Sequence, residues 1–402
     1  MKIAHLEQKA SAYLHTLCVE VGGRQVGAQG NRDATDFFAA ALAALGFEIQ
    51  TPAFDCMAWR AGSARLEVGG AVFTAEPSPY SLGCRVLAPL VVVSTVDELE
   101  QADAQQILLL RGAIAQEQLM PKNFPFYNPA HHQHIIRLLE TKQPAAIITA
   151  TARDAAMAGG LYPFPLIEDG DFDIPSVYLT DEVGERLAQY AGQPLLLASQ
   201  AERMAARGCN VIARRGADQA RRVVVCAHID AKMGTPGALD NGGGVVTLLL
   251  LGELLADYAG SLGLEIVAIN GEDYYSSPGE QLYLAMNAGR FDTIALNINL
   301  DGVGYREGKD AYSLYECPDE TAVTIHNVFS IAGDLVAGEP WFQGDHAIFV
   351  MQGVPALAIT SERVAELLAT IVHTADDVPE LVAARKLARL AGALRDLILA
   401  LH

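Results

Sequence analysis

The second half of the chain alternates strand-like apolar runs with helical segments, and this alternation constrains the fold more than any other feature. The strand-like runs occupy residues 210–214, 222–227, 264–270, 293–300, 311–315 and 355–360. Helical patterns lie between or after them, at residues 243–258, 278–288, 320–332 and 379–401. Strands that alternate with helices predict β-α-β units and a parallel sheet. Ligands bind such sheets beyond the carboxyl ends of the strands, so polar clusters there are candidate sites.

The middle of the chain, from about residue 55 to residue 205, has a different pattern. Short strand-like stretches at residues 64–68, 90–94, 107–110, 145–149 and 176–179 are separated by Gly, Pro and charged turns. One helix is predicted there, from Asn128 through Leu139, with Pro129 at its first position. Ahead of this region come two helical patterns, at residues 5–19 and 31–45, and a strand at residues 47–54. We therefore predict an α/β domain formed by residues 1–54 and 206–402, with a mainly β domain inserted at residues 55–205.

Composition excludes several classes of protein. The formal net charge is −20, from 28 basic and 48 acidic residues, so nucleic acids and anionic membranes are poor partners. The charges of Lys2, Glu7 and Lys9 interrupt any apolar run at the N-terminus, and the apolar run 245–251 is too short to span a bilayer. The 6 cysteines form no CxxC pair and are expected to be reduced thiols. We predict a cytoplasmic protein.

Imidazole and carboxylate side chains follow the predicted strands where each strand ends. They are His228, Asp230, Asp240, Glu272, Asp273, Asp301 and His373. Taken singly, Asp240 fits a helix cap and Asp301-Gly302 fits a turn. Together they suit zinc, cobalt or manganese in a hydrolytic site. Five candidate ligands and a spare glutamate favour two ions over one, because a carboxylate such as Asp240 can bridge ions about 3.5–4 Å apart.

Several motifs around these residues resemble a known family. They are GRQVGAQGNRDATDFFAAALAALGF (23–47), CNVIARRG (209–216), VVVCAHID (223–230), ALDNGGGV (238–245), INGED (269–273), NINLDGVG (297–304), GDHAIF (344–349), GVPALAI (353–359) and HTADD (373–377). The chain is similar to the co-catalytic, double-zinc aminopeptidases, a family that also includes glutamate carboxypeptidase, the glutaminyl cyclases and the inactive transferrin-receptor ectodomain. The resemblance implies a three-layer α/β/α core around a mostly parallel mixed sheet.

The resemblance also implies a ligand set. Asp240 would bridge two metal ions, most simply zinc, with cobalt or manganese as alternatives. His228 and Asp301 would complete one site, and Asp273 and His373 the other. One of these ligands departs from the family pattern, since the usual Glu-Glu pair is Glu-Asp here and Asp273 is one methylene shorter.

The remaining roles follow from the same resemblance. Glu272 would be the general base, taking a proton from the attacking water and returning it to the leaving amine. Asp230 would accept the other ring N–H of His228 and orient it. The peptide bond between Asp240 and Asn241 would be cis.

The family often places a tyrosine where this chain has Val372 or Trp341, so the donor to the tetrahedral oxyanion is open. The candidates are His346, Tyr274, Tyr275 and Tyr305. Trp341 and Phe342 are candidates for the pocket of the substrate's first side chain, or else ordinary core aromatics.

The inserted region resembles the protease-associated domain that some family members carry, through LAPLVVV (87–93), ILLLRG (107–112), AAIIT (145–149) and IPSVYLT (174–180). Such a domain is expected to shape the substrate cleft, and a generic β insertion is the alternative. Within it, His131, His132 and His134 could be mistaken for a metal motif. Only His131 and His134 share a helix face, so we interpret them as helix surface.

The sequence therefore predicts a metal-dependent exopeptidase that acts on peptides with a free N-terminus, with a homo-oligomer as an open alternative to a monomer. A carboxypeptidase of the same fold would need arginines to grip the substrate carboxylate, and Arg290, Arg306 and Arg363 form no recognisable patch. A glutaminyl cyclase would need one metal ion. An inactive, peptidase-fold binding protein would have replaced its metal ligands.

Overall fold

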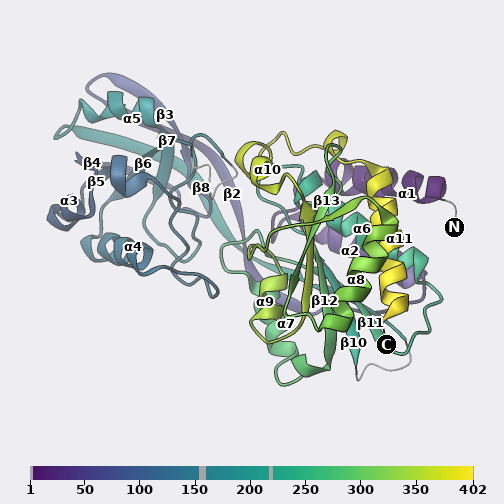
Figure 1. Ribbon diagram of the computed structural model, residues 1–402. Helices are drawn as coiled ribbons and strands as arrows, with labels where there is room; N and C mark the ends of the chain where they lie inside the picture. Colours follow the sequence, from purple (N-terminus) through teal and green to yellow (C-terminus); the bar gives the residue numbers. More distant parts are fainter. Residues whose placement is uncertain (1–2, 154–159, 217–220, 402) are drawn as a thin grey trace. The chain divides into compact units, whose positions relative to one another are not determined.

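The computed structural model describes residues 3–153, 160–216 and 221–401, and the chain separates into two compact units. The first, which we call the sheet unit, comprises Met1–Cys56, Arg207–Leu367 and Ile371–His402. The second, the barrel unit, comprises Met57–Ala206 and Leu368–Thr370. Each unit is described by itself (Figure 1).

A mixed sheet forms the centre of the sheet unit. Its strands, in spatial order, are β1 (Glu48–Gln50), β9 (Val211–Arg215), β11 (Gly263–Ile269), β10 (Arg222–His228), β12 (Ile294–Leu300), β15 (Ala356–Ser361), β13 (Asp310–Tyr315) and β14 (Leu335–Ala337). The four central strands β11, β10, β12 and β15 are parallel, whereas β9 and β13 pair antiparallel with their inner neighbours. The predicted α/β fold class is confirmed.

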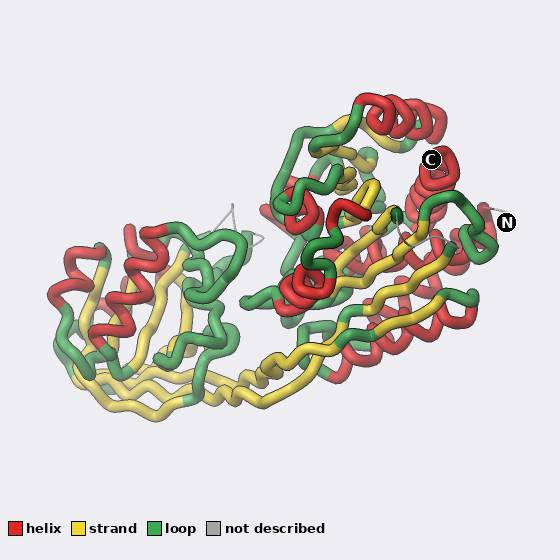
Figure 2. The backbone as a smooth tube through the Cα atoms, turned by 90° about the horizontal axis from the view of Figure 1, so that it is seen from below, coloured by secondary structure: helices red, strands yellow, loops and turns green. Residues whose placement is uncertain are grey.

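Helices cover both faces of this sheet (Figure 2). They are α1 (Ile3–His15), α2 (Gln29–Ala44), α6 (Gly243–Leu254), α7 (Pro278–Met286), α8 (Asp319–Ala332), α9 (His346–Val350), α10 (Val364–Thr370) and α11 (Ala384–Ala400). Helix α6 is apolar on all sides and is buried between the sheet and α1, α2 and α11. Strand β10 is buried along its whole length, as expected of a parallel strand covered on both faces.

The parallel register brings three strand ends to one edge. His228, the last residue of β10, pairs with Ile269, the last residue of β11. Cys226 of β10 pairs with Asn299, near the end of β12. The loops that follow these three strands therefore begin side by side.

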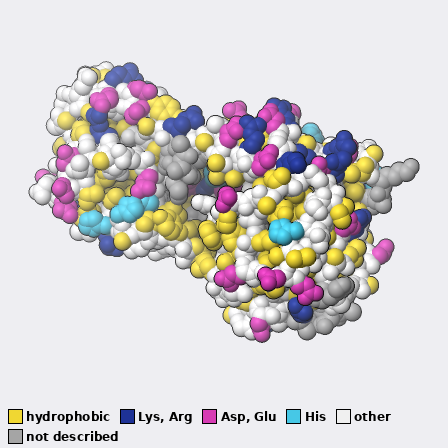
Figure 3. All heavy atoms as spheres, viewed as in Figure 1, with side chains coloured by type: hydrophobic (Ala, Val, Ile, Leu, Met, Phe, Trp, Pro, Cys, Tyr) yellow, Lys and Arg dark blue, Asp and Glu magenta, His cyan; other side chains and the backbone are white. Residues whose placement is uncertain are grey.

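Within its described residues, the barrel unit has a closed seven-stranded barrel and three α-helices. Its strands, in spatial order, are β2 (Ala53–Val68), β3 (Ala71–Pro77), β7 (Ser176–Thr180), β6 (Ala146–Thr151), β5 (Ile107–Leu110), β4 (Cys84–Val93) and β8 (Pro194–Cys209). Its helices are α3 (Val96–Gln101), α4 (Ala130–Lys142) and α5 (Asp181–Ala188). Acidic and basic side chains are interspersed over the face drawn in Figure 3.

Four observed elements differ from the predicted ones. Strands β2 and β8 are 16 residues long, although the sequence predicts only residues 64–68 of the first and none of the second. Helix α4 begins at Ala130, and Pro129 is its extended N-cap. The last helix begins at Ala384, since Pro379–Leu381 form a separate 3-10 turn and Val382 pairs with Tyr305 in an isolated bridge.

Within the described residues no helix combines the length and the apolar character needed to cross a bilayer.

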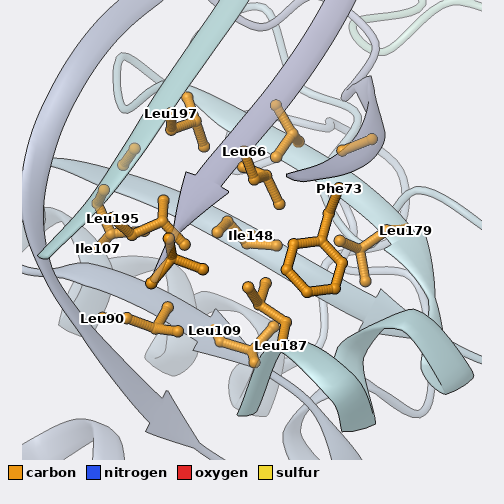
Figure 4. Packing of buried hydrophobic residues seen from close by; sticks show 14 of the residues in the cluster. Leu66, Phe73, Leu90, Ile107, Leu109, Ile148, Leu179, Leu187, Leu195 and Leu197 are labelled. Atoms are coloured by element: carbon orange, nitrogen blue, oxygen red, sulfur yellow. The ribbon is translucent and has the colours of Figure 1, made fainter. Parts of the chain in front are cut away.

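The barrel core gives a direct test of packing. Leu109 lies on β5 and is fully buried among Leu66, Leu90 and Ile148 (Figure 4). We expect Leu109→Ala to lower the free energy of unfolding by about 2–5 kcal/mol, because it removes buried methyl groups and leaves a cavity. Urea unfolding measures this. The control is Leu87→Ala on β4, since Leu87 is 68% exposed and should change the free energy little. Equal effects of the two variants would contradict the observed burial.

Candidate metal centre

The carboxyl edge of the sheet brings the predicted ligands together. His228 ends β10, Asp273 follows β11, and Asp301 follows β12 directly. Asp240 lies in the π-helical turn Ala238–Gly242 that leads into α6. His373 lies in the loop after α10. Four separate loops thus supply two imidazoles and three carboxylates to one place.

Asp240 lies between the two histidines. Its Oδ1 is 2.9 Å from His228 Nε2, and its Oδ2 is 2.9 Å from His373 Nε2. Asp301 Oδ1 lies 3.7 Å from His228 Nε2, and Asp273 Oδ1 lies 3.0 Å from His373 Nε2. Two groups result, His228–Asp240–Asp301 and Asp240–Asp273–His373, and in each group all ligand atoms lie within 4.8 Å of one another. Asp240 is common to both, and this is the grouping that the resemblance implies.

The donor set fits divalent cations. His228 is 1% exposed, and neither of its ring nitrogens makes a hydrogen bond of good geometry. The buried Oδ2 of Asp273 also lacks a hydrogen-bond partner. Buried polar atoms without partners are costly. Metal ions between these imidazoles and carboxylates would satisfy them, and nitrogen and oxygen ligands of this kind suit zinc.

The electrostatics of the cluster depend on strong mutual interactions. Burial opposes charge on His228, yet Asp230, Asp240 and Asp301 together raise its pKa well above the usual range. For Asp240 burial acts in the other direction, but the two histidines outweigh it and lower the pKa of the carboxyl. The carboxylates thus favour positive charge at this place, as a bound cation would supply.

Glu272 lies beside these ligands. A carboxylate oxygen of Glu272 is within 4.8 Å of ligand atoms of His228 and Asp273. Desolvation raises the pKa of Glu272 well above its usual range, and the nearby carboxylates of Asp273 and Asp301 add to this effect. A carboxyl whose pKa is raised in this way suits proton transfer.

Asp230 is buried, and its carboxylate binds backbone N–H groups. It accepts hydrogen bonds from the N–H groups of Gly271 (2.7 Å) and Asp273 (3.1 Å). Its Oδ1 lies 3.7 Å from His228 Nδ1, which is longer than a hydrogen bond. Asp230 thus connects the end of β10 to the loop that carries Glu272 and Asp273, a role that the sequence did not indicate.

Asp377 is a further residue of the site to which the sequence analysis gave no role. Its carboxylate accepts the N–H groups of Leu239 (2.7 Å) and Asp240 (3.1 Å), and its carbonyl accepts that of Ala238. Burial, with the nearby charge of Asp240, raises its pKa to about 6. The sequence feature that could have indicated this role is the position of Asp377 four residues after His373, within the motif HTADD. The Asp240–Asn241 peptide bond is cis, so that prediction is confirmed.

The candidates from the GDHAIF region have different environments. His346 is fully buried, its Nε2 lies 2.8 Å from the carbonyl of Trp341, and its Nδ1 lies 3.4 Å from Asn299 Nδ2. Burial lowers the pKa of His346 to about 4. Its two ring nitrogens therefore have neighbours within the protein.

The indole of Trp341 borders the metal centre. A Cβ placed on Gly344 would lie 2.9 Å from Trp341 Cζ3 and 3.1 Å from Asp301 Oδ2, so both groups lie against the same glycine. Phe342 is 64% exposed and packs edge-on against Tyr315.

The rings of the three tyrosines that are candidate oxyanion donors make packing contacts. Tyr274 and Tyr275, which follow Asp273, pack against each other with ring centroids 4.5 Å apart. Tyr305 is buried, and the Arg363 guanidinium lies over its ring.

The histidines of α4 gather around Glu117. His131 Nε2 is 2.8 Å and His132 Nε2 is 3.1 Å from Glu117 Oε1. The Met120 N–H donates to His132 Nδ1 at 3.1 Å. His132 is buried, so the interpretation as helix surface is wrong for this residue, and Glu117, His131 and His132 lie close enough together to hold a metal ion.

Comparison with known proteins finds a matching family. Residues 210–398, which contain all five candidate ligands and Glu272, match the family described as peptidase family M28. The similarity to peptidase family M28 thus covers the part of the chain that carries the candidate metal ligands. The predicted relationship to the double-zinc exopeptidases is thereby confirmed.

The M28 relationship extends to individual proteins. The chain is 27% identical over 287 residues to the probable lipoprotein aminopeptidase LpqL of Mycobacterium tuberculosis, a match that covers 70% of this chain and 55% of that protein. The chain thus spans about half the length of this curated relative.

Solved structures show the same fold. The aminopeptidase from Aneurinibacillus sp. strain AM-1 has a TM-score of 0.74 at 19% identity, covering 98% of this chain and 93% of that one. The zinc aminopeptidase BSAP from Bacillus subtilis has a TM-score of 0.74 at 17% identity, covering 98% and 94%. At such identities the likeness concerns the fold alone.

Proposed function

We propose that this protein is a metal-dependent aminopeptidase that removes the N-terminal residue from peptides. The observation that carries the proposal is the position of Asp240 between His228 and His373, with Asp301 and Asp273 completing two overlapping ligand groups. The position of Glu272 beside both groups supports it. The names of the relatives, which are aminopeptidases, support the choice of reaction.

Two divalent ions, zinc first and cobalt or manganese as alternatives, are proposed to be held by His228, Asp240, Asp273, Asp301 and His373. Such ions polarise a scissile carbonyl and lower the pKa of water. Glu272 takes the proton of the attacking water and delivers it to the leaving amine. Asp230 and Asp377 hold the backbone on which Glu272 and Asp240 are carried.

The first test asks from which end the protein shortens a peptide. We expect a peptide with a free N-terminus to lose residues one at a time from that end when the protein is loaded with zinc. The same peptide with an acetylated N-terminus should stay intact, because an aminopeptidase requires the free amine. Mass spectrometry of both digests measures this. Cleavage of the acetylated peptide, or shortening from the C-terminus alone, would contradict the proposal.

The carboxypeptidase alternative has less support. Arg363, one of the arginines available to bind a substrate carboxylate, already bonds to Glu307 and Glu366. An inactive binding protein is also disfavoured, because all five ligand positions and Glu272 carry usable side chains that lie together.

The remaining assignments stay proposals from the sequence. We propose a catalytic domain of residues 1–54 and 206–402 and a protease-associated-like domain of residues 55–205. His346, Trp341 and Phe342 stay candidates for contacts with the substrate or the oxyanion. Peptides are the proposed partners, and a cytoplasmic location remains a prediction.

A further inference from the structure

A buried arginine from the N-terminal segment holds the loop of the bridging ligand. Arg24 is 1% exposed and donates to four carbonyl oxygens. One belongs to Leu17 (3.0 Å), and the other three belong to Ile229 (3.0 Å), Pro236 (2.8 Å) and Gly237 (2.8 Å). These three residues lie in the segment that joins His228 to Asp240. The guanidinium therefore fixes both ends of this connection.

The same loop is held from its other side. Asp377 accepts the N–H groups of Leu239 and Asp240, whereas Arg24 binds the carbonyls just before them. Gly237 has a φ of +61°, and a Cβ at this position would lie 2.5 Å from the Asp240 carbonyl oxygen and 2.9 Å from Arg24 Nη2. The close approach of the guanidinium thus requires glycine here. The position of the Asp240 carboxylate follows from this two-sided attachment.

A buried asparagine from the same segment holds the loop of the general base. Asn31 is 1% exposed and exchanges two hydrogen bonds with Asn270, Nδ2 to Oδ1 at 2.8 Å and Oδ1 from Nδ2 at 2.9 Å. Asn270 lies two residues before Glu272. A side-chain amide pair of this kind fixes the direction of both side chains, because each supplies the donor that the other needs.

The two attachments are themselves connected. Asn31 Nδ2 also donates to the carbonyl of Arg24 at 2.9 Å. Asn270 N–H donates to Asn210 Oδ1 at 3.0 Å, and Asn210 Nδ2 donates to the Gly279 carbonyl at 2.8 Å, so the loop after β11 is held at both ends. Residues 24–31 thus contact the loop of Asp240 and the loop of Glu272 at once, although they lie outside the segment that matches family M28.

We propose that Arg24 and Asn31 are positioning residues of the metal centre, which set the spacing between the bridging carboxylate and the general base. The proposal rests on the function proposed above, in that it takes these carboxylates to bind divalent ions. Neither side chain touches an ion or a substrate. Each acts through the backbone of a loop that carries ligands.

The test uses Arg24→Lys and Asn31→Ala with a matched control pair. Arg222 and Asn287 are also buried in the sheet unit and bond to each other, Nη2 to Oδ1, at 2.7 Å, but they lie at the amino end of β10. Arg222→Lys and Asn287→Ala therefore remove comparable buried hydrogen bonds at the end of β10 that is opposite to His228. The measurements are the zinc dissociation constant, by competition with a chromogenic chelator, and urea unfolding of each metal-free protein.

We expect all four variants to lower the stability of the metal-free protein, because each leaves buried polar groups without partners. Only Arg24→Lys and Asn31→Ala should also weaken zinc binding, by about 10–100-fold, the effect usual for groups that support metal ligands. If the two weaken zinc binding no more than Arg222→Lys and Asn287→Ala do, their role is merely structural and the proposal is overturned.

Two further variants serve if Arg24→Lys or Asn31→Ala does not fold. Gly237→Ala places a methyl group against both the Asp240 carbonyl and Arg24, and Asn270→Ala removes the partner of Asn31. Both should weaken zinc binding, and unchanged binding in both would overturn the proposal. A wild-type protein that binds zinc but cleaves no peptide would contradict the proposed activity and leave this comparison valid. A wild-type protein that binds no zinc would overturn the positioning proposal.

Discussion

Replacing Glu272 with Gln is expected to lower kcat by about 10²–10⁴-fold, the usual contribution of a general acid–base residue. The amide keeps the shape of the side chain but cannot take a proton from water. Glu272 lies beside both ligand groups, whereas each of those groups is complete without it. Zinc binding should therefore persist in this variant, and calorimetric titration with zinc next to steady-state kinetics measures the two effects separately.

The control for this variant is Glu253→Gln. Glu253 is a largely buried glutamate of α6 that bonds to Tyr13 and Lys9, away from the metal ligands. Its replacement should cost some stability and leave kcat within about twofold, as expected of a substitution that touches no reacting atom. A Glu272→Gln protein with the kcat of wild type would refute the assigned role, and a Glu272→Gln protein that loses zinc would make Glu272 a ligand instead.

The sequence was sufficient for three of the five ligands, because local rules place them. His228, Asp273 and Asp301 immediately follow apolar runs that can only be buried parallel strands, and parallel strands end at one edge. The sequence alone therefore indicates their proximity. The bridging role of Asp240 needed the resemblance to the family, since it lies in a loop with no periodic pattern.

The supporting hydrogen bonds could not be predicted in this way. Arg24 meets Ile229 across 205 positions in the chain, and Asn31 meets Asn270 across 239. Neither residue belongs to a pattern that indicates its partner, because a buried arginine or asparagine has no preferred spacing. Their motif was recognised from family resemblance, but the contacts appear only when α2 packs against the sheet.

The long barrel strands were missed for a different reason. The stretches AGSAR in β2 and AERMAAR in β8 are rich in Ala, Gly and charged residues, which are depleted in strands. Their residues are largely exposed, so no buried face produces an alternating apolar pattern. Pairing with neighbouring strands, which the local sequence does not encode, keeps them extended.

Removing the metal ions is expected to lower thermal stability as well as activity. A ligand present at a thousand times its dissociation constant stabilises the folded state by about 4 kcal/mol per site. At about 2–4 °C per kcal/mol for a unit of this size, chelation should lower Tm on the order of 10 °C for each site emptied. Mass action alone produces this loss of stability. A second cause adds to it, because without metal ions His228 and Asp273 have buried atoms that lack hydrogen-bond partners.

Asp240→Ala separates metal binding from a general effect of the chelator. Because Asp240 belongs to both ligand groups, its removal should weaken both sites, and the Tm of this variant should no longer respond to zinc or to chelator. Asp301→Ala is the matched comparison, since Asp301 belongs to one group and should leave the other site partly responsive. Differential scanning calorimetry of the three proteins, with and without zinc, measures this. A Tm of Asp240→Ala that rises with zinc as much as that of wild type would show that the ions bind elsewhere.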